Sequence, residues 1–181
     1  RYMLAVAAGV VSYGLMAFVM TAAPIAMVNT GHSVNSAALG IQWHLLAMFA
    51  PSFVTGRLMT RFGKERVTAA GMLLIAVSAV VALAGLELIN FWGSLAIMGL
   101  GWNFSFIGAT AMVTDCHTPG ARAKAQGAND FMVFGTTAAV SFLAGSVLHN
   151  SGWAAINWLL FPPVALILVP LLWQAARKPQ A

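Results

Sequence analysis

Ionisable side chains inside long apolar segments are the first candidates for chemistry in this sequence, because a titratable group in apolar surroundings is costly to keep. His44 is such a residue, and it could carry a proton or donate a hydrogen bond to a bound molecule. With about 100° of rotation per residue, His44 shares one helical face with Pro51 and Thr55. The alternative is a histidine that bonds a neighbouring helix and fixes its packing.

Asn103 begins a second polar line, which continues through Thr110 and Thr114 on one helical face. This line predicts either the lining of a polar cavity or hydrogen bonds between helices. Trp102 stands beside Asn103 and could contact an aromatic or amphipathic ligand, although packing alone also explains an aromatic residue there.

A face of small residues accompanies this polar line. Gly101, Ser105 and Ala109 recur every four residues. Small side chains at this spacing let two helices approach closely, so we expect a neighbouring helix to pack there.

Tyr13 and Met20 share a line in the first apolar segment, and Met16 lies beside it. Methionine side chains repack around varied apolar shapes, and the sequence has ten of them. The stripe predicts an adaptable pocket for a lipophilic compound, with lipid-facing or packing methionines as the alternative. Together, the candidate substrate-site or proton-site residues are His44, Asn103, Tyr13, Met20, Trp102, Gln42 and Thr137.

Recognisable enzyme motifs are absent from the sequence. No nucleophile and base stand in a known pattern, and no phosphate-binding G-x-x-x-x-G-K-S/T loop occurs. Cys116 is the only cysteine, which excludes a disulfide framework and a multi-cysteine metal site. We therefore expect neither an enzyme nor a bound cofactor or metal.

The composition indicates an integral membrane protein. Of the 181 residues, 60% are hydrophobic and 7% are charged, against about 25% charged residues in an average soluble domain. Apolar windows of about 20 residues, the length of one helical crossing, occur six times. The predicted transmembrane helices cover residues 3–27, 37–59, 67–86, 91–113, 128–148 and 153–172.

Positive charge fixes the predicted orientation of these six helices. All nine Lys and Arg residues fall before the first segment, after the last, at the junction of the second and third, or between the fourth and fifth. Six crossings place them all on one face, which the positive-inside rule makes cytoplasmic, together with both termini. The net charge of +5 is thereby explained by topology, and no nucleic-acid partner is needed.

The second connection, residues 56–66, carries a recognisable motif. Its residues Gly56, Arg57, Arg61, Gly63, Lys64 and Arg66 stand in the order G-R-x-x-x-R-x-G-K-x-R. This resembles the cytoplasmic loop of the major facilitator superfamily (MFS), G-x-x-x-D-R-x-G-R/K-x-R, with Thr60 in place of the aspartate. Physically, Gly63 permits a tight reversal and Gly56 a close helix approach. The cations would bind lipid headgroups, and the resemblance adds a gating role.

The resemblance implies an architecture and an activity. A degraded loop motif, six helices and a first residue, Arg1, that is not Met look like the C-terminal half of an MFS transporter, helices 7–12. The implied protein is a secondary transporter in a bacterial inner membrane, moving a small organic solute by alternating access. Its partners would be that solute, the lipid bilayer and a missing N-terminal six-helix half. Coupling to a proton gradient and efflux of lipophilic compounds are the favoured finer expectations.

Asp130 is the one carboxylate that could lie within a predicted helix, close to its cytoplasmic end. The resemblance suggests a salt link from Asp130 to an arginine in the loop of the missing half, broken when the transporter opens. Direct proton coupling and a solvated interfacial acid are the alternatives.

Two other readings of the whole chain stay open at this point. One is a six-helix membrane scaffold or assembly subunit without a transport cycle, in which the polar lines only join helices. The other is a half-transporter that works as a homodimer.

Overall fold

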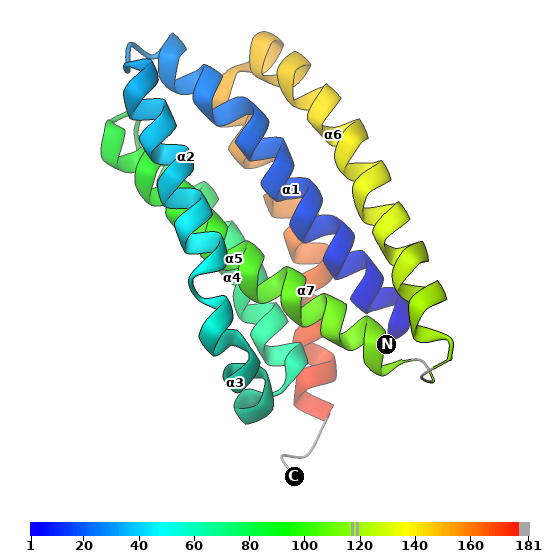
Figure 1. Ribbon diagram of the computed structural model, residues 1–181. Helices are drawn as coiled ribbons and strands as arrows, with labels where there is room; N and C mark the ends of the chain where they lie inside the picture. The colour runs from blue at the N-terminus through cyan, green and yellow to red at the C-terminus, as the bar shows by residue number, and fades with distance from the viewer. Residues whose placement is uncertain (117, 119, 178–181) are drawn as a thin grey trace.

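Every regular element in the described part of the chain, residues 1–116, 118 and 120–177, is an α-helix in the computed structural model. The helices run side by side as a bundle, and the start of α1 lies at the same end as the end of α7 (Figure 1). Their bounds are α1 Tyr2–Asn29, α2 Val34–Phe49, α3 Ser52–Phe62, α4 Lys64–Leu83, α5 Leu88–Asp115, α6 Arg122–Trp158 and α7 Phe161–Arg177.

Most helices of the bundle are long and apolar enough to cross a membrane. The helices Tyr2–Asn29, Lys64–Leu83 and Leu88–Asp115 each qualify, as does the 55-residue helical stretch Arg122–Ala176. The pair Val34–Phe49 and Ser52–Phe62, bent by 42°, qualifies as a single broken span. The bundle is therefore that of an integral membrane protein, as the composition predicts.

The predicted second helix, 37–59, is not continuous. It breaks at Ala50 and Pro51, between α2 and α3. Proline has no N–H and its ring clashes with the preceding turn, so the helix is interrupted at Pro51. The predicted segment thus remains one candidate span, but a broken one.

The last two predicted helices also differ from their expected bounds. The chain turns back within 122–176, and Gly152, with a φ of +78°, is the residue that leaves the helical conformation. This lies inside the turn expected near residue 150. Pro162 and Pro163 stand in the first turn of α7, where proline fits because the N–H groups there have no partner within the helix.

Helix α5 packs against α4, α2 and α1, and backbone meets backbone in two of these contacts. A Cβ atom on Gly71 of α4 would lie 2.6 Å from the Gly101 carbonyl oxygen, and one on Gly99 would lie 3.1 Å from the Met48 nitrogen of α2. The predicted small-residue face is confirmed at Gly101 and Ser105, which meet Gly71.

Two glycines of the 56–66 connection have different roles. Gly63 has a φ of +88° and allows the reversal between α3 and α4, which confirms the prediction. Gly56 has no atom of the described residues within 4 Å of where its Cβ would be, so the close helix approach expected there is not made within the described residues.

We expect Gly71→Ala to destabilise the protein by about 1–3 kcal/mol, because the added methyl overpacks a backbone contact between α4 and α5. Thermal unfolding in detergent would measure the loss. Gly56→Ala is the matched control, since a methyl there meets open space. Equal melting temperatures for the two variants would contradict the close α4–α5 contact.

Candidate substrate pocket and cytoplasmic charge cluster

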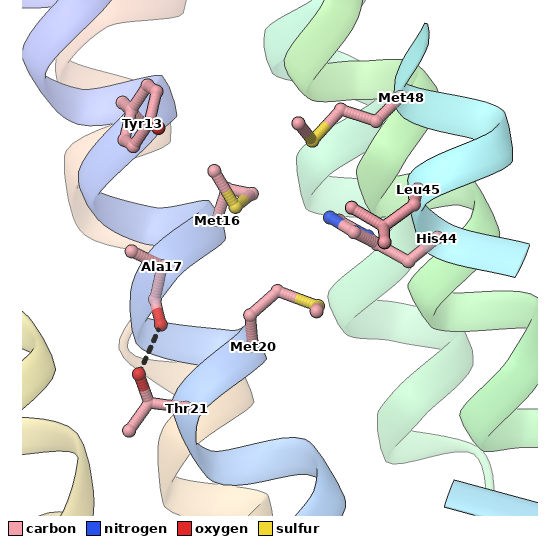
Figure 2. Close-up of a pocket in the computed structure, with 8 residues that line it drawn as sticks. All are labelled: Tyr13, Met16, Ala17, Met20, Thr21, His44, Leu45 and Met48. Carbon is pink, nitrogen blue, oxygen red and sulfur yellow. Dashed lines mark hydrogen bonds between the residues drawn. The ribbon is translucent and has the colours of Figure 1, made fainter. Parts of the chain in front are cut away.

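An open pocket of about 350 Å³ lies between α1 and α2 (Figure 2). Its lining is mostly apolar, with hydroxyl groups on Tyr13 and Thr21 and one imidazole, on His44. The lining residues are Tyr13, Met16, Ala17, Met20, Thr21, His44, Leu45 and Met48. The structure thus brings together three of the predicted candidates, Tyr13, Met20 and His44.

His44 is fully buried and lies at the floor of the pocket. Its Nδ1 is 2.8 Å from the Leu95 carbonyl oxygen of α5. Its Nε2 has no hydrogen-bond partner among the described residues. The packing alternative is therefore seen at Nδ1, which joins two helices, while a role of His44 in a site stays a prediction.

An aromatic cluster borders the pocket at Tyr13. Its ring makes edge contacts with Trp102 and Phe106 of α5 and with Phe134 of α6, at centroid distances of 5.6, 5.1 and 5.4 Å. Trp102 and Phe106 stack at 5.0 Å. Trp102 is therefore a neighbour of the pocket through Tyr13. Sequence analysis missed Phe106, although its place four residues after Trp102 puts both on one helical face.

Asn103 is fully buried and faces the helix break instead of the pocket. Its Nδ2 donates to the Met48 carbonyl oxygen at 2.8 Å and to the Ser52 hydroxyl at 2.7 Å, and its Oδ1 accepts from Thr55 at 2.6 Å. The last carbonyls of α2 lack partners within their own helix. Asn103 satisfies one of them and ties both sides of the break to α5.

Two other candidates lie away from the pocket. Gln42 is on the exposed side of α2, and Thr137 donates to the Val133 carbonyl oxygen within α6 at 2.7 Å. Neither belongs to the lining. Their positions in apolar helices made them candidates, but the faces they occupy depend on the packing of the bundle.

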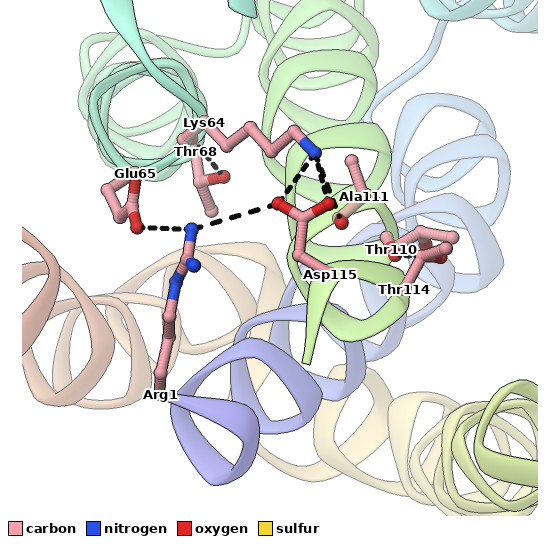
Figure 3. Close-up of polar contacts among 8 residues, drawn as sticks. All are labelled: Arg1, Lys64, Glu65, Thr68, Thr110, Ala111, Thr114 and Asp115. Atoms are coloured by element: carbon pink, nitrogen blue, oxygen red, sulfur yellow. Dashed lines mark hydrogen bonds and ion pairs between the residues drawn. The ribbon is translucent and has the colours of Figure 1, made fainter. Parts of the chain in front are cut away.

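A charge cluster joins three helices at the end of the bundle where α1 begins (Figure 3). The Lys64 ammonium lies 2.7 Å from an Asp115 carboxylate oxygen, and Arg1 lies 2.8 Å from Glu65 and 3.8 Å from Asp115. Sequence analysis named Lys64 but missed Glu65 and Asp115. Partly exposed pairs such as Lys64–Asp115 contribute about 0–1 kcal/mol each, so their main effect is to set the positions of the helix ends.

The other loop cations face outward. Arg57, Arg61 and Arg66 are exposed, and the Arg61 guanidinium lies 5.2 Å from the centroid of the Phe62 ring. Asp130 accepts a hydrogen bond from Gln126 at 2.8 Å, and no cation of the described residues forms a salt bridge with it. Lys178, a cation of the predicted cytoplasmic face, lies outside the described residues.

The model of the Major Facilitator Superfamily matches residues 5–181. The chain belongs to this superfamily. The fold agrees: the crystal structure of a D-xylose–proton symporter superposes with a TM-score of 0.70 over 99% of this chain and 49% of that one, at 17% identity. The family resemblance of the 56–66 motif is thereby confirmed.

Curated relatives lie within the same superfamily. The Riboflavin transporter RfnT of Brucella anthropi is 68% identical over 98% of this chain. Two uncharacterized MFS-type transporters of Bacillus subtilis, YdeG and YddS, are 33% and 32% identical over 90% of it. The chain spans 45% of the length of the first relative and 38% of each of the others.

We expect Asn103→Leu to destabilise the protein by about 1–3 kcal/mol, because interhelical hydrogen bonds in membranes contribute about 0.6 kcal/mol each and a helix-end carbonyl would lose its partner. Thermal unfolding in detergent would detect this. Asn150→Leu, at an exposed position of α6, is the control. A melting temperature for Asn103→Leu equal to that of the control would mean that Asn103 does not hold the break.

Proposed function

We propose that the protein containing this chain transports riboflavin, or a flavin closely related to it, across a bacterial cytoplasmic membrane by alternating access. The observation that carries the proposal is the 68% identity to a riboflavin transporter over 98% of the chain. A vitamin of this kind replaces the lipophilic efflux substrate that the methionines suggested.

The proposed architecture has six crossings with both ends of the chain in the cytoplasm. Three single helices, one broken pair and a stretch of 55 residues, long enough for two crossings of about 20, support this number. The positive-inside rule supports the orientation, because the α3–α4 connection and the start of α6, which carry cations, lie at the same end of the bundle. A second six-helix half would complete the transporter.

The chemistry of the pocket suits a flavin. Riboflavin combines a planar aromatic ring system with a chain of hydroxyl groups. Methionine thioethers and aromatic edges pack against flat rings, and both line or border the pocket between α1 and α2. Hydroxyl groups and one imidazole supply the few polar contacts that fix a ligand's orientation.

Coupling and gating belong to the same proposal. A proton gradient would drive transport, since the chain has no phosphate-binding loop. Asp130 is half-exposed at the cytoplasmic side of α6 and free of any cation within the described residues, which suits a salt link to the other half. The exposed Arg57, Arg61 and Arg66 suit lipid headgroups or the same gate.

We expect the full protein, reconstituted in liposomes, to move radiolabelled riboflavin down its gradient, and faster when a proton gradient is imposed. Tyr13→Ala should slow the flux at least tenfold, because it removes the ring at the centre of the aromatic border. Tyr2→Ala, in the first turn of α1 and outside the pocket, is the control.

The rival readings give different results in this assay. A scaffold subunit would show no riboflavin flux and no binding, and would contradict the proposal outright. Riboflavin flux through liposomes that contain only this chain would favour the homodimeric half-transporter, and crosslinking of the isolated chain would then detect dimers.

A further inference from the structure

The unpaired nitrogen of His44 indicates which kind of hydrogen-bonding group a ligand must present. The carbonyl oxygen of Leu95 can only accept a hydrogen bond, so Nδ1 must carry the proton that bridges the 2.8 Å between them. In the neutral imidazole only one nitrogen is protonated, and Nε2 then presents a lone pair. A group that we expected to donate to a substrate is, in this arrangement, an acceptor.

The direction of that lone pair is set by packing. Figure 2 shows the His44 ring extending from α2 towards the side chains of α1, with Met16 and Met20 opposite. His44 is fully buried, and its Nε2 has no partner among the described residues. A buried polar atom without a partner costs about 1–3 kcal/mol, so a ligand that supplies a hydrogen-bond donor gains by satisfying it.

The Thr21 hydroxyl favours the same kind of ligand, whereas the Tyr13 hydroxyl can donate or accept. The Thr21 hydroxyl donates to the Ala17 carbonyl oxygen at 2.8 Å and so has only lone pairs left to offer. No lysine or arginine is among the eight lining residues. This wall of the pocket therefore offers no cation to a phosphate group. It suits a neutral ligand that carries N–H or O–H donors.

We infer that His44 Nε2 accepts a hydrogen bond from the neutral, unphosphorylated flavin and is a specificity-determining contact of this pocket. The donor is the imide N–H of the ring system or a hydroxyl of the ribityl chain. Met16 and Met20, on the opposite wall of the pocket, have flexible side chains that can adapt to the ligand. This inference rests on the proposed function and adds the chemical basis of substrate choice.

Binding to the full purified protein, followed by quenching of flavin fluorescence, tests this inference. Four ligands are compared: riboflavin, 3-methylriboflavin, which lacks the imide N–H, lumiflavin, which lacks the ribityl chain, and flavin mononucleotide, which adds a phosphate. Each is titrated into the wild type, His44→Leu and His44→Gln. Glutamine can donate to Leu95 through its amide nitrogen and still offer an oxygen to the pocket. His149→Leu, at an exposed histidine of α6, is the matched control.

We expect the wild type to bind one of the first two analogues, and flavin mononucleotide, about tenfold or more weakly than riboflavin. The analogue that loses affinity identifies the donor. In His44→Leu the preference for riboflavin over that analogue should disappear, in His44→Gln part of it should return, and the control should behave as the wild type.

Three results would overturn the inference. The first is an undiminished preference in His44→Leu. The second, which stands even if that variant fails to fold, is equal wild-type affinity for riboflavin and both donor-deficient analogues. The third is tight binding of flavin mononucleotide. Absence of riboflavin binding by the wild type is a separate outcome, because it refutes the proposed function itself.

Discussion

The close approach of α5 to its neighbours is the constraint on which the rest of the structure depends. Gly71 and Gly101 bring α4 and α5 into backbone contact, and Gly99 does the same between α5 and α2. In lipid there is no hydrophobic force between helices, so such contacts and a few hydrogen bonds hold a bundle together. Because α2 lies tightly on α5, His44 reaches the Leu95 carbonyl oxygen and Asn103 reaches the break before α3.

The pocket has few free polar atoms because polar side chains nearby form hydrogen bonds with backbone carbonyl groups. Proline interrupts α2, and in hydrocarbon each unpaired carbonyl that results is costly. Asn103 is used there, and the Thr21 and Thr137 hydroxyls bond carbonyls of their own helices. Among the lining residues of the pocket, His44 Nε2 is the buried atom without a hydrogen-bond partner in the described part of the chain. The pocket wall is thus apolar, with acceptors at His44 and Thr21 and a hydroxyl at Tyr13 that can donate or accept.

Composition and charge predicted the membrane class, and the loop motif with its Gly63 reversal predicted the family; the structure and the family match agree with both. Tyr13, Met20 and His44 could be proposed from their types and do meet in one pocket. For Asn103 the interhelical hydrogen bond was one of two predicted alternatives, but its place at the helix break was not predicted, nor were the exposure of Gln42 and the pairing of Lys64 with Asp115. These features depend on how each helix is rotated relative to its neighbours, and the residue spacing within one sequence does not reveal that rotation.

A structure of the full protein with riboflavin bound tests the central claim most directly. The account predicts flavin density between α1 and α2, with a donor atom of the ligand within about 3.2 Å of His44 Nε2. The aromatic ring of Tyr13 should lie against the ligand. Density at another place in the bundle, with His44 still buried and unpaired, would contradict the assignment of this pocket as the substrate site.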